Sequence, residues 1–231
     1  MIHVHVRKPD GTHLLDAAAY RSVIEAIRNE TGGRILVQIT SEALGIYTPA
    51  EQIAVVKAAK PRAASLALRE IAPDAEAEPG FLALLDWMSR ERVAPQIILY
   101  APEEAVRLAA MRDGGKLPFA DIPVLYVLGR YTPGQKSEPA DLLPFLGESM
   151  PRFAHWSVCA FGAREAACVA TAAMLGGHVR VGFENNLMLP DGTRAPDNAA
   201  LVAAAATLVR GAGLELATAA ELDRTWSWPQ P

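Results

Sequence analysis

The chain has 231 residues, of which 51% are hydrophobic and 21% charged, so it has apolar material for one sizeable core and too little charge to be disordered. Its apolar runs are broken by charge, Pro or Gly well before the ~18 residues that a membrane span needs, which excludes a transmembrane helix. A net charge of −4 without a basic block offers no electrostatic footprint for nucleic acid or anionic lipid, so we expect a small-molecule ligand.

Cysteine content and the first residues indicate the compartment. Cys159 and Cys168 are the only cysteines, which is too few for a disulfide framework. Residues 1–11, MIHVHVRKPDG, carry charges where a signal peptide has its apolar stretch. We therefore expect a cytoplasmic protein whose cysteines are buried small hydrophobes.

Short β-branched or aliphatic runs alternate with helical stretches along the whole chain. The expected strands cover 2–6, 35–40, 63–68, 95–100, 124–129, 156–161 and 178–183. The expected helices cover 16–30, 49–60, 80–91, 102–113, 139–149, 164–175 and 197–211. Such alternation predicts parallel strands joined by right-handed crossovers, and no GxGxxG follows any expected strand. The pattern therefore favours a barrel over a doubly wound sheet.

A complete (β/α)8 barrel has one strand more than this sequence offers. We therefore expect a single TIM-type barrel domain over residues 1–231 that lacks the first strand and helix. The alternatives are an eighth segment that the pattern does not reveal and an open barrel that a partner closes. An open parallel edge exposes backbone groups and apolar surface, so we also expect a homo-oligomer, a dimer or tetramer.

The first expected strand carries a candidate metal site. Alternate side chains of a strand share a face, so His3, His5 and Arg7 point the same way. Two imidazoles at this spacing bring two neutral nitrogen ligands within reach of one divalent cation, and imidazole suits zinc. The alternative is a pair of half-buried histidines without a metal.

The segment GGHVRVGFENN (176–186) places charge on one side of the last expected strand. Arg180, Gly182 and Glu184 share one parity, and a charged inward face is costly unless it binds something. Glu184 is therefore a candidate third metal ligand beside the two histidines, which leaves the open position of a catalytic zinc site. The alternative is a structural Arg180–Glu184 ion pair.

Several motifs together resemble one family. They are HVHVRKPDGTHLLD (3–16), PQIILY (95–100), VLYVLGRYTPG (124–134), WSVCAFGAREA (156–166) and GGHVRVGFENNLMLPDG (176–192). In this order and spacing, they resemble the β-keto acid cleavage enzyme family over nearly the whole chain. The resemblance implies a TIM barrel.

The resemblance also implies a chemistry. It implies that His3, His5 and Glu184 bind Zn²⁺, and that an acyl group passes between a β-keto acid and acetyl-CoA, giving acetoacetate and a new CoA thioester. The zinc ion would polarise the keto oxygen, and Arg180 would orient the catalytic base.

The sequence departs from the family at the base. Asn185 stands where the family has an aspartate, and an amide does not take a proton at neutral pH. The family's first strand and helix carry a further carboxylate and are absent, and the acidic residue expected within 95–100 is replaced. Glu42 shares a face with Gln38 and Thr40, so it is our candidate for a replacement carboxylate at the barrel mouth. The alternative is a helix-capping or solvated glutamate.

Weaker candidates lie on the strand 156–161 and the turn after it. Ser157 and the turn at Gly162 are candidates for binding a phosphate of CoA at a helix N-terminus, the alternative being a tight turn that needs glycine. The remaining histidines, which have no companion at ligand spacing, are His13, His155 and His178. Two functions stay open: a zinc-dependent acyltransferase, and a zinc-binding barrel that has lost catalysis and acts as a ligand-binding or regulatory protein.

Overall fold

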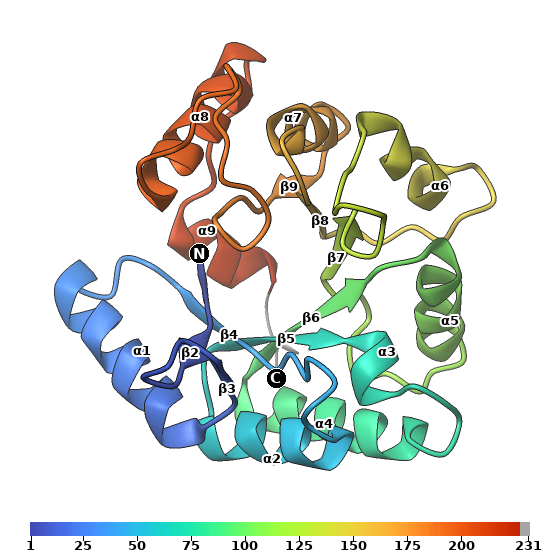
Figure 1. The fold of residues 1–231 in the computed structure, drawn as a ribbon. Coiled ribbons are helices and arrows are strands. Elements are labelled where there is room, and N and C mark those ends of the chain that lie inside the picture. Colours follow the sequence, from blue (N-terminus) through green and yellow to red (C-terminus); the bar gives the residue numbers. More distant parts are fainter. Residues whose placement is uncertain (227–231) are drawn as a thin grey trace. The chain divides into compact units, whose positions relative to one another are not determined.

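The computed structural model describes residues 1–226, coloured in chain order in Figure 1. Within it the chain forms two compact units. Unit 1 consists of Met1–Ile98, Ala110–Ile122 and the segment from Thr218 onward, and unit 2 consists of Leu99–Ala109 and Pro123–Ala217.

Unit 1 is built on parallel strands. Their order is β1 (Ile2–Val4), β4 (Val37–Thr40), β5 (Ala63–Ala67) and β6 (Ala94–Leu99), each paired in parallel with the next. The register places His3 opposite Gln38, and Ser65 opposite both Thr40 and Gln96. The strands β4, β5 and β6 are buried along their whole length, as expected of parallel strands covered on both faces.

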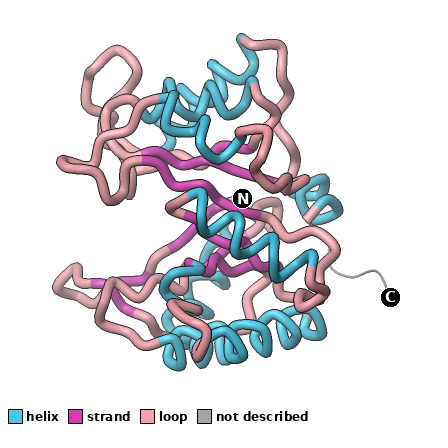
Figure 2. The backbone as a smooth tube through the Cα atoms, turned by 90° about the vertical axis from the view of Figure 1, so that its right-hand side faces the viewer, coloured by secondary structure: helices cyan, strands magenta, loops and turns pink. Residues whose placement is uncertain are grey.

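Helices cover these strands in the way that parallel pairing requires. They are α1 (Ala17–Thr31), α2 (Pro49–Ala59), α3 (Leu68–Ile71), α4 (Glu78–Glu91) and α9 (Ala219–Thr225). Figures 1 and 2 show α2 and α4 in a layer along one side of β4 and β5. The start of α2 is set by a capping box between Thr48 and Glu51, with Pro49 in the first turn.

Unit 2 repeats the same plan. Its strands β7 (Val124–Leu128), β8 (Trp156–Ala160) and β9 (His178–Val179) pair in parallel in this order. Helix α5 (Pro102–Asp113) begins in unit 2, and the others there are η1 (Pro139–Leu142), α6 (Leu143–Leu146), α7 (Glu165–Met174) and α8 (Asn198–Gly211). The predicted alternation of parallel strands and helices is thus confirmed in both units, and it fits a TIM-like α/β fold.

The expected first strand, 2–6, is wrong in extent because its second half has a different partner. The parallel ladder with β4 ends at Val4, and β2 (Val6–Arg7) pairs antiparallel with β3 (His13–Leu14). The hairpin closes through a turn in which Gly11 N donates to Lys8 O at 2.9 Å. His5 therefore lies between two strands, and Arg7 is exposed on the hairpin instead of sharing a sheet face with the histidines.

The expected last strand, 178–183, is also too long. It ends at Val179, although Arg180 N still donates to Val158 O at 2.9 Å. Beyond it the backbone turns, since the N–H groups of Asn185 and Asn186 both donate to Gly182 O. Glu184 therefore lies on a turn, and the predicted alternation of a charged inner face and an apolar outer face does not extend to it.

The predicted helices are confirmed to within two residues at each end, with one exception. The stretch 139–149 forms only the short elements η1 and α6. Pro139 lies in the first turn of η1 and Pro144 in the first turn of α6, and a proline interrupts a helix that would continue through it. Helices α3 and α9 are not in the sequence prediction. Among the described residues, no helix is both long and apolar enough to cross a membrane.

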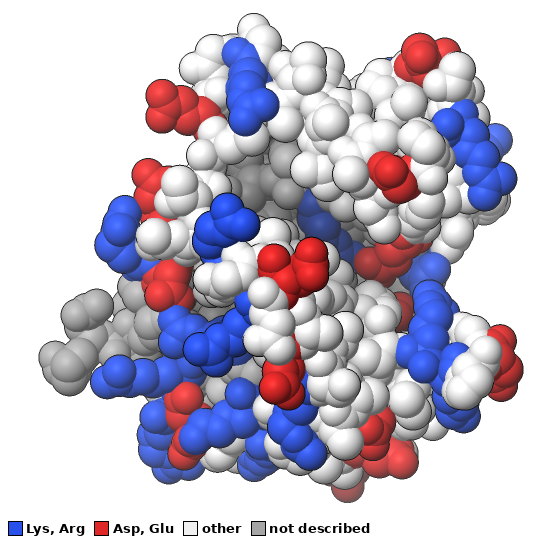
Figure 3. All heavy atoms as spheres, turned by 90° about the vertical axis from the view of Figure 1, so that its left-hand side faces the viewer, with Lys and Arg blue, Asp and Glu red and all other residues white. Residues whose placement is uncertain are grey.

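Charged side chains of both signs lie interspersed on the face that Figure 3 shows. This agrees with the absence of a basic block in the sequence.

Candidate functional site

The first two histidines face each other in unit 1. His3 Nε2 and His5 Nε2 lie 3.1 Å apart, although only His3 belongs to β1. Two nitrogens that each bind zinc at about 2.05 Å, and that are this far apart, subtend an angle of about 98° at the metal, which is close to tetrahedral. The donor atoms therefore fit two ligand positions of a zinc ion.

A buried amide fixes the orientation of His3. The Oε1 atom of Gln38, opposite His3 in the strand register, lies 2.8 Å from His3 Nδ1. Gln38 in turn donates through Nε2 to Gln96 Oε1 at 3.1 Å, and both glutamines are buried. An amide oxygen only accepts, so His3 Nδ1 carries the proton and Nε2 presents its lone pair toward His5. This is the outer partner that a metal-binding histidine needs.

A carboxylate lies beside Nδ1 of His5, as the Gln38 amide lies beside Nδ1 of His3. Glu42 Oε2 lies 3.6 Å from His5 Nδ1, at ion-pair distance, and both side chains are 15% exposed. A carboxylate at Nδ1 favours a proton there and leaves Nε2 as the ligand atom. Glu42 lies just beyond the end of β4 and is not a solvated surface glutamate.

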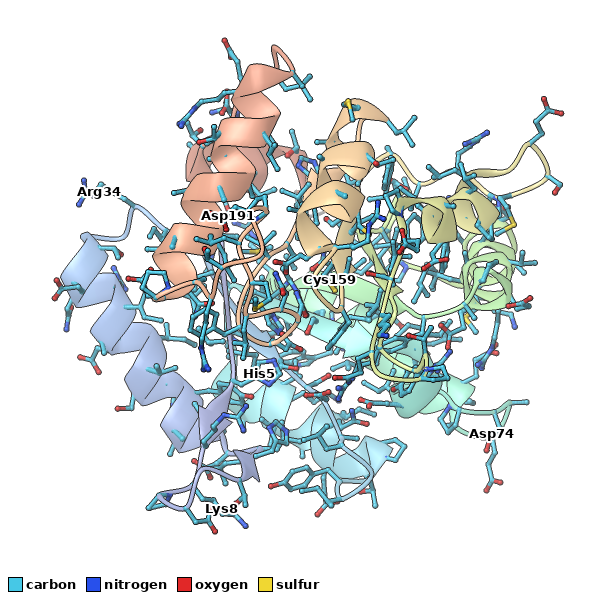
Figure 4. All side chains as sticks on the ribbon, turned by 45° about the horizontal axis from the view of Figure 1, so that its top comes forward. His5, Lys8, Arg34, Asp74, Cys159 and Asp191 are labelled. Carbon is cyan, nitrogen blue, oxygen red and sulfur yellow. The ribbon has the colours of Figure 1, made fainter. Side chains whose placement is uncertain are left out.

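His13 lies close to His5, a contact that was not expected from the sequence. The β2–β3 hairpin folds the chain back, so the ring centroids of His5 and His13 are 5.9 Å apart. His13 Nε2 donates to the backbone oxygen of Glu42 at 2.8 Å. Ligand atoms of His5, His13 and Glu42 lie within 4.8 Å of one another. The expectation that His13 has no companion is therefore wrong, because linear spacing does not reveal a hairpin contact. Figure 4 shows Lys8 at the far tip of this hairpin, away from His5.

In unit 2, Arg180 and Glu184 form an ion pair. Arg180 Nη2 donates to Glu184 Oε2 at 3.0 Å, with side chains 17% and 36% exposed. The alternative that the sequence analysis left open, an ion pair between these residues, is thus present. It does not remove Glu184 from consideration as a ligand, because a carboxylate bound by one arginine retains acceptor sites.

Asn185 contacts a buried acid. Its Nδ2 lies 3.5 Å from Glu165 Oε1, and its backbone oxygen accepts from Gly162 N at 3.0 Å. Glu165 is 2% exposed, and burial raises its pKa to about 7 against the opposing effect of hydrogen bonds from Asn186, Gly182 and Asn185. Sequence reasoning missed Glu165. The available signal was an acidic residue at the start of the alanine-rich segment 165–174.

The proposed phosphate-binding turn has a structural role. Gly162 has φ +93°, and a Cβ there would lie 2.6 Å from Gln135 O. The N–H of Gly162 donates to Asn185 O. Ser157 is buried on β8. The tight turn that requires glycine is therefore observed. A CoA phosphate contact at Ser157 and Gly162 stays a prediction.

Both cysteines are buried in unit 2, as expected. Burial raises the pKa of the Cys159 thiol, labelled in Figure 4, to about 11, and it also raises the pKa of Cys168. Neither residue has the lowered pKa of a reactive thiolate.

Comparison with known proteins identifies the family. Residues 1–225 match the family described as beta-keto acid cleavage enzyme. A 3-keto-5-aminohexanoate cleavage enzyme of Fusobacterium nucleatum is 31% identical over 227 residues, covering 94% of this chain and 79% of the relative. A 3-oxoadipate:acetyl-CoA acetyltransferase of Cupriavidus necator is 28% identical over 230 residues, covering 96% of this chain and 78% of the relative. A 3-keto-5-aminohexanoate cleavage enzyme of Acetoanaerobium sticklandii is 29% identical over 229 residues, covering 96% and 81%.

The matches extend over nearly the whole described chain and are to proteins named as enzymes. They confirm the resemblance that the sequence motifs indicated. The protein is therefore an enzyme that belongs to the beta-keto acid cleavage enzyme family.

Proposed function

We propose that this enzyme is zinc-dependent and transfers an acyl group between a β-keto acid and acetyl-CoA. The family and the names of the relatives support β-keto acid cleavage by acyl transfer. In the proposed reaction, the bond between the keto carbon and the neighbouring CH₂ carbon breaks. The released acetate unit joins the acetyl group as acetoacetate, and the remaining acyl group forms a new CoA thioester.

The observation that carries the metal proposal is the arrangement of the histidine pair. The Nε2 atoms of His3 and His5 face each other at 3.1 Å, while Gln38 and Glu42 lie at their Nδ1 atoms. We propose Glu184 as the third ligand, which leaves one position for substrate. The bound Zn²⁺ would supply a Lewis acid that polarises the keto oxygen and holds the substrate carboxylate.

The protein groups then have separate tasks. Gln38 and Glu42 hold the imidazole rings, and Arg180 holds the Glu184 carboxylate at 3.0 Å. Asn185 cannot accept a proton, so we propose that Glu42 is the carboxylate that receives the proton from the substrate. Asn185 would then orient groups of the site as a hydrogen-bond donor.

We also propose that the two units belong to one TIM-type β/α barrel domain, and that the protein is a cytoplasmic homo-oligomer. The parallel strands of each unit support the barrel. Light scattering at micromolar concentration should show a dimer or tetramer, and a stable monomer would contradict the oligomer.

A second function is favoured by one observation. Asn185 is an amide bonded to a buried acid, so the site has no carboxylate at this position to act as a base. A chain that binds zinc without turnover would be a ligand-binding or regulatory protein.

Metal analysis and turnover separate these possibilities. Purified wild type should contain about one zinc per chain, which a His3→Ala/His5→Ala double variant should lose. The matched control, His178→Ala, changes an exposed histidine at the start of β9 and should retain zinc. Turnover of a β-keto acid panel with acetyl-CoA supports the enzyme. Equal metal content in wild type and the double variant would refute the proposed site.

A further inference from the structure

Glu165 is a buried acid, and the arginine next to it in the sequence forms an ion pair with a different residue. It is the first residue of α7 and 2% exposed. The adjacent Arg164 lies on the surface, where its guanidinium pairs with Glu138 at 3.1 Å. A buried carboxyl group needs hydrogen-bond donors. In this structure the donors come from the segment 182–186, far along the chain.

Three donors of this segment converge on the one carboxyl group. Asn186 Nδ2 lies 3.2 Å from Glu165 Oε2, while Gly182 N lies 3.3 Å and Asn185 Nδ2 3.5 Å from Oε1. These residues flank Glu184 on both sides. The carboxyl group of Glu165 therefore restrains the backbone before Glu184 and the side chains after it.

Other hydrogen bonds also restrain the turn: Gly162 N donates to Asn185 O at 3.0 Å, and the Asn186 side chain bonds to the backbone of Met188. The internal bonds of the turn run from Asn185 N and Asn186 N to Gly182 O, and Phe183 N donates to Asn198 Oδ1 at 2.8 Å. Asn185 Oδ1 is buried without a hydrogen-bond partner among the described residues. A carboxylate only accepts hydrogen bonds, so Glu165 selects the amide orientation in which Nδ2 of Asn185 faces α7.

We propose that Glu165 is a positioning residue, which through the 182–186 turn holds the Glu184 carboxylate and the Asn185 amide in the geometry that zinc binding and acyl transfer need. The proposal rests on the proposed function, because it takes Glu184 as a zinc ligand. Glu165 itself touches neither metal nor substrate. It acts as outer partners of metal ligands do, whose loss weakens metal affinity about 10-fold to about 100-fold.

The pairing of one acid with one amide makes the test specific. Asn185→Asp alone places two carboxyl groups about where the 3.5 Å contact now lies, and these groups repel each other when both are ionised, which disfavours the contact between the turn and α7. Glu165→Gln alone keeps one acceptor oxygen but replaces the other with an NH₂ donor, so the three donors of the turn no longer all find an acceptor. The double variant Glu165→Gln/Asn185→Asp again has one acid and one amide, with their positions exchanged.

The experiment measures zinc affinity by chelator competition, together with kcat and KM. Glu165→Gln should raise the zinc Kd at least about 10-fold and lower kcat, with KM changed less. The double variant should bind zinc more tightly than Asn185→Asp alone. The control Glu103→Gln makes the same change in the first turn of α5, at an exposed site, and should match wild type.

A merely structural role predicts a different result. Folded Glu165→Gln with wild-type zinc Kd and kcat, and only a lower melting temperature, would overturn the positioning role. So would a double variant that shows no recovery over Asn185→Asp. Wild type that binds zinc but turns over no β-keto acid would refute the proposed function alone, and the zinc Kd of Glu165→Gln would still decide the role of Glu165.

Discussion

The buried carboxyl group of Glu165 should make the free energy of unfolding depend on pH, and the substitution Glu165→Gln should remove this dependence. Burial raises its pKa from 4.5 to about 7 in the folded protein. Between these values the folded chain retains a proton that the unfolded chain releases. Its contribution to stability is therefore fully present below about pH 4.5 and is lost as pH rises through about 7. Glu165→Gln keeps the shape but does not titrate.

The pKa difference sets the size of the effect. A shift from 4.5 to about 7 corresponds to about 3 kcal/mol at about 1.4 kcal/mol per pH unit. Solvent screening reduces this free energy only slightly, because Glu165 is only 2% exposed. The free energy of unfolding of wild type, relative to that of Glu165→Gln, should therefore fall by about 3 kcal/mol between about pH 4.5 and about pH 8.

Urea unfolding at several pH values between about 4.5 and about 8 measures this difference. A chelator is present throughout, so that protonation of metal ligands does not add its own pH dependence. Glu103→Gln, the exposed control, should follow the wild-type curve. Parallel pH dependences of wild type and Glu165→Gln would refute the reasoning, because the acid would then have the same pKa folded and unfolded.

Three further predictions test the turn, the histidine partner and the base. Gly162→Ala should destabilise the protein by more than about 2 kcal/mol in urea unfolding, whereas Gly192→Ala, also at positive φ but with open space around its Cβ, should cost only about 1 kcal/mol. Gln38→Leu removes the acceptor of His3 Nδ1 and should weaken zinc binding about 10-fold to about 100-fold in chelator competition, and unchanged affinity would contradict the role of this amide. Glu42→Gln keeps an acceptor oxygen beside His5 Nδ1 but cannot take a proton, so it should lower kcat by about two to four decades with little change in zinc content. Wild-type turnover in this variant would place the base elsewhere.

The sequence by itself determined the kinds of elements and most of their extent. Hydrophobic runs, caps and glycine stops depend on neighbours along the chain, so the helices at 16–30, 49–60 and 102–113 agree closely with α1, α2 and α5. The motifs around His3 and Glu184 were likewise sufficient to indicate the family, which the match over residues 1–225 confirms.

Tertiary structure decided where strands end and which groups meet. The run 2–6 divides because Val6 and Arg7 pair with His13 and Leu14, a partner that periodicity within the run does not reveal. Likewise, hydrogen bonds to Gly182 O turn the backbone where the alternation predicted a longer strand.

The groups that orient the site residues by hydrogen bonds also come from distant parts of the chain. Gln38 reaches His3 through strand register, and Glu165 reaches Asn185 across the turn that begins at Gly162. Whether a buried amide or acid has a partner depends on contacts between residues many positions apart, which no local pattern encodes. The sequence therefore named the candidate ligand atoms, while the folded chain decided which groups orient them.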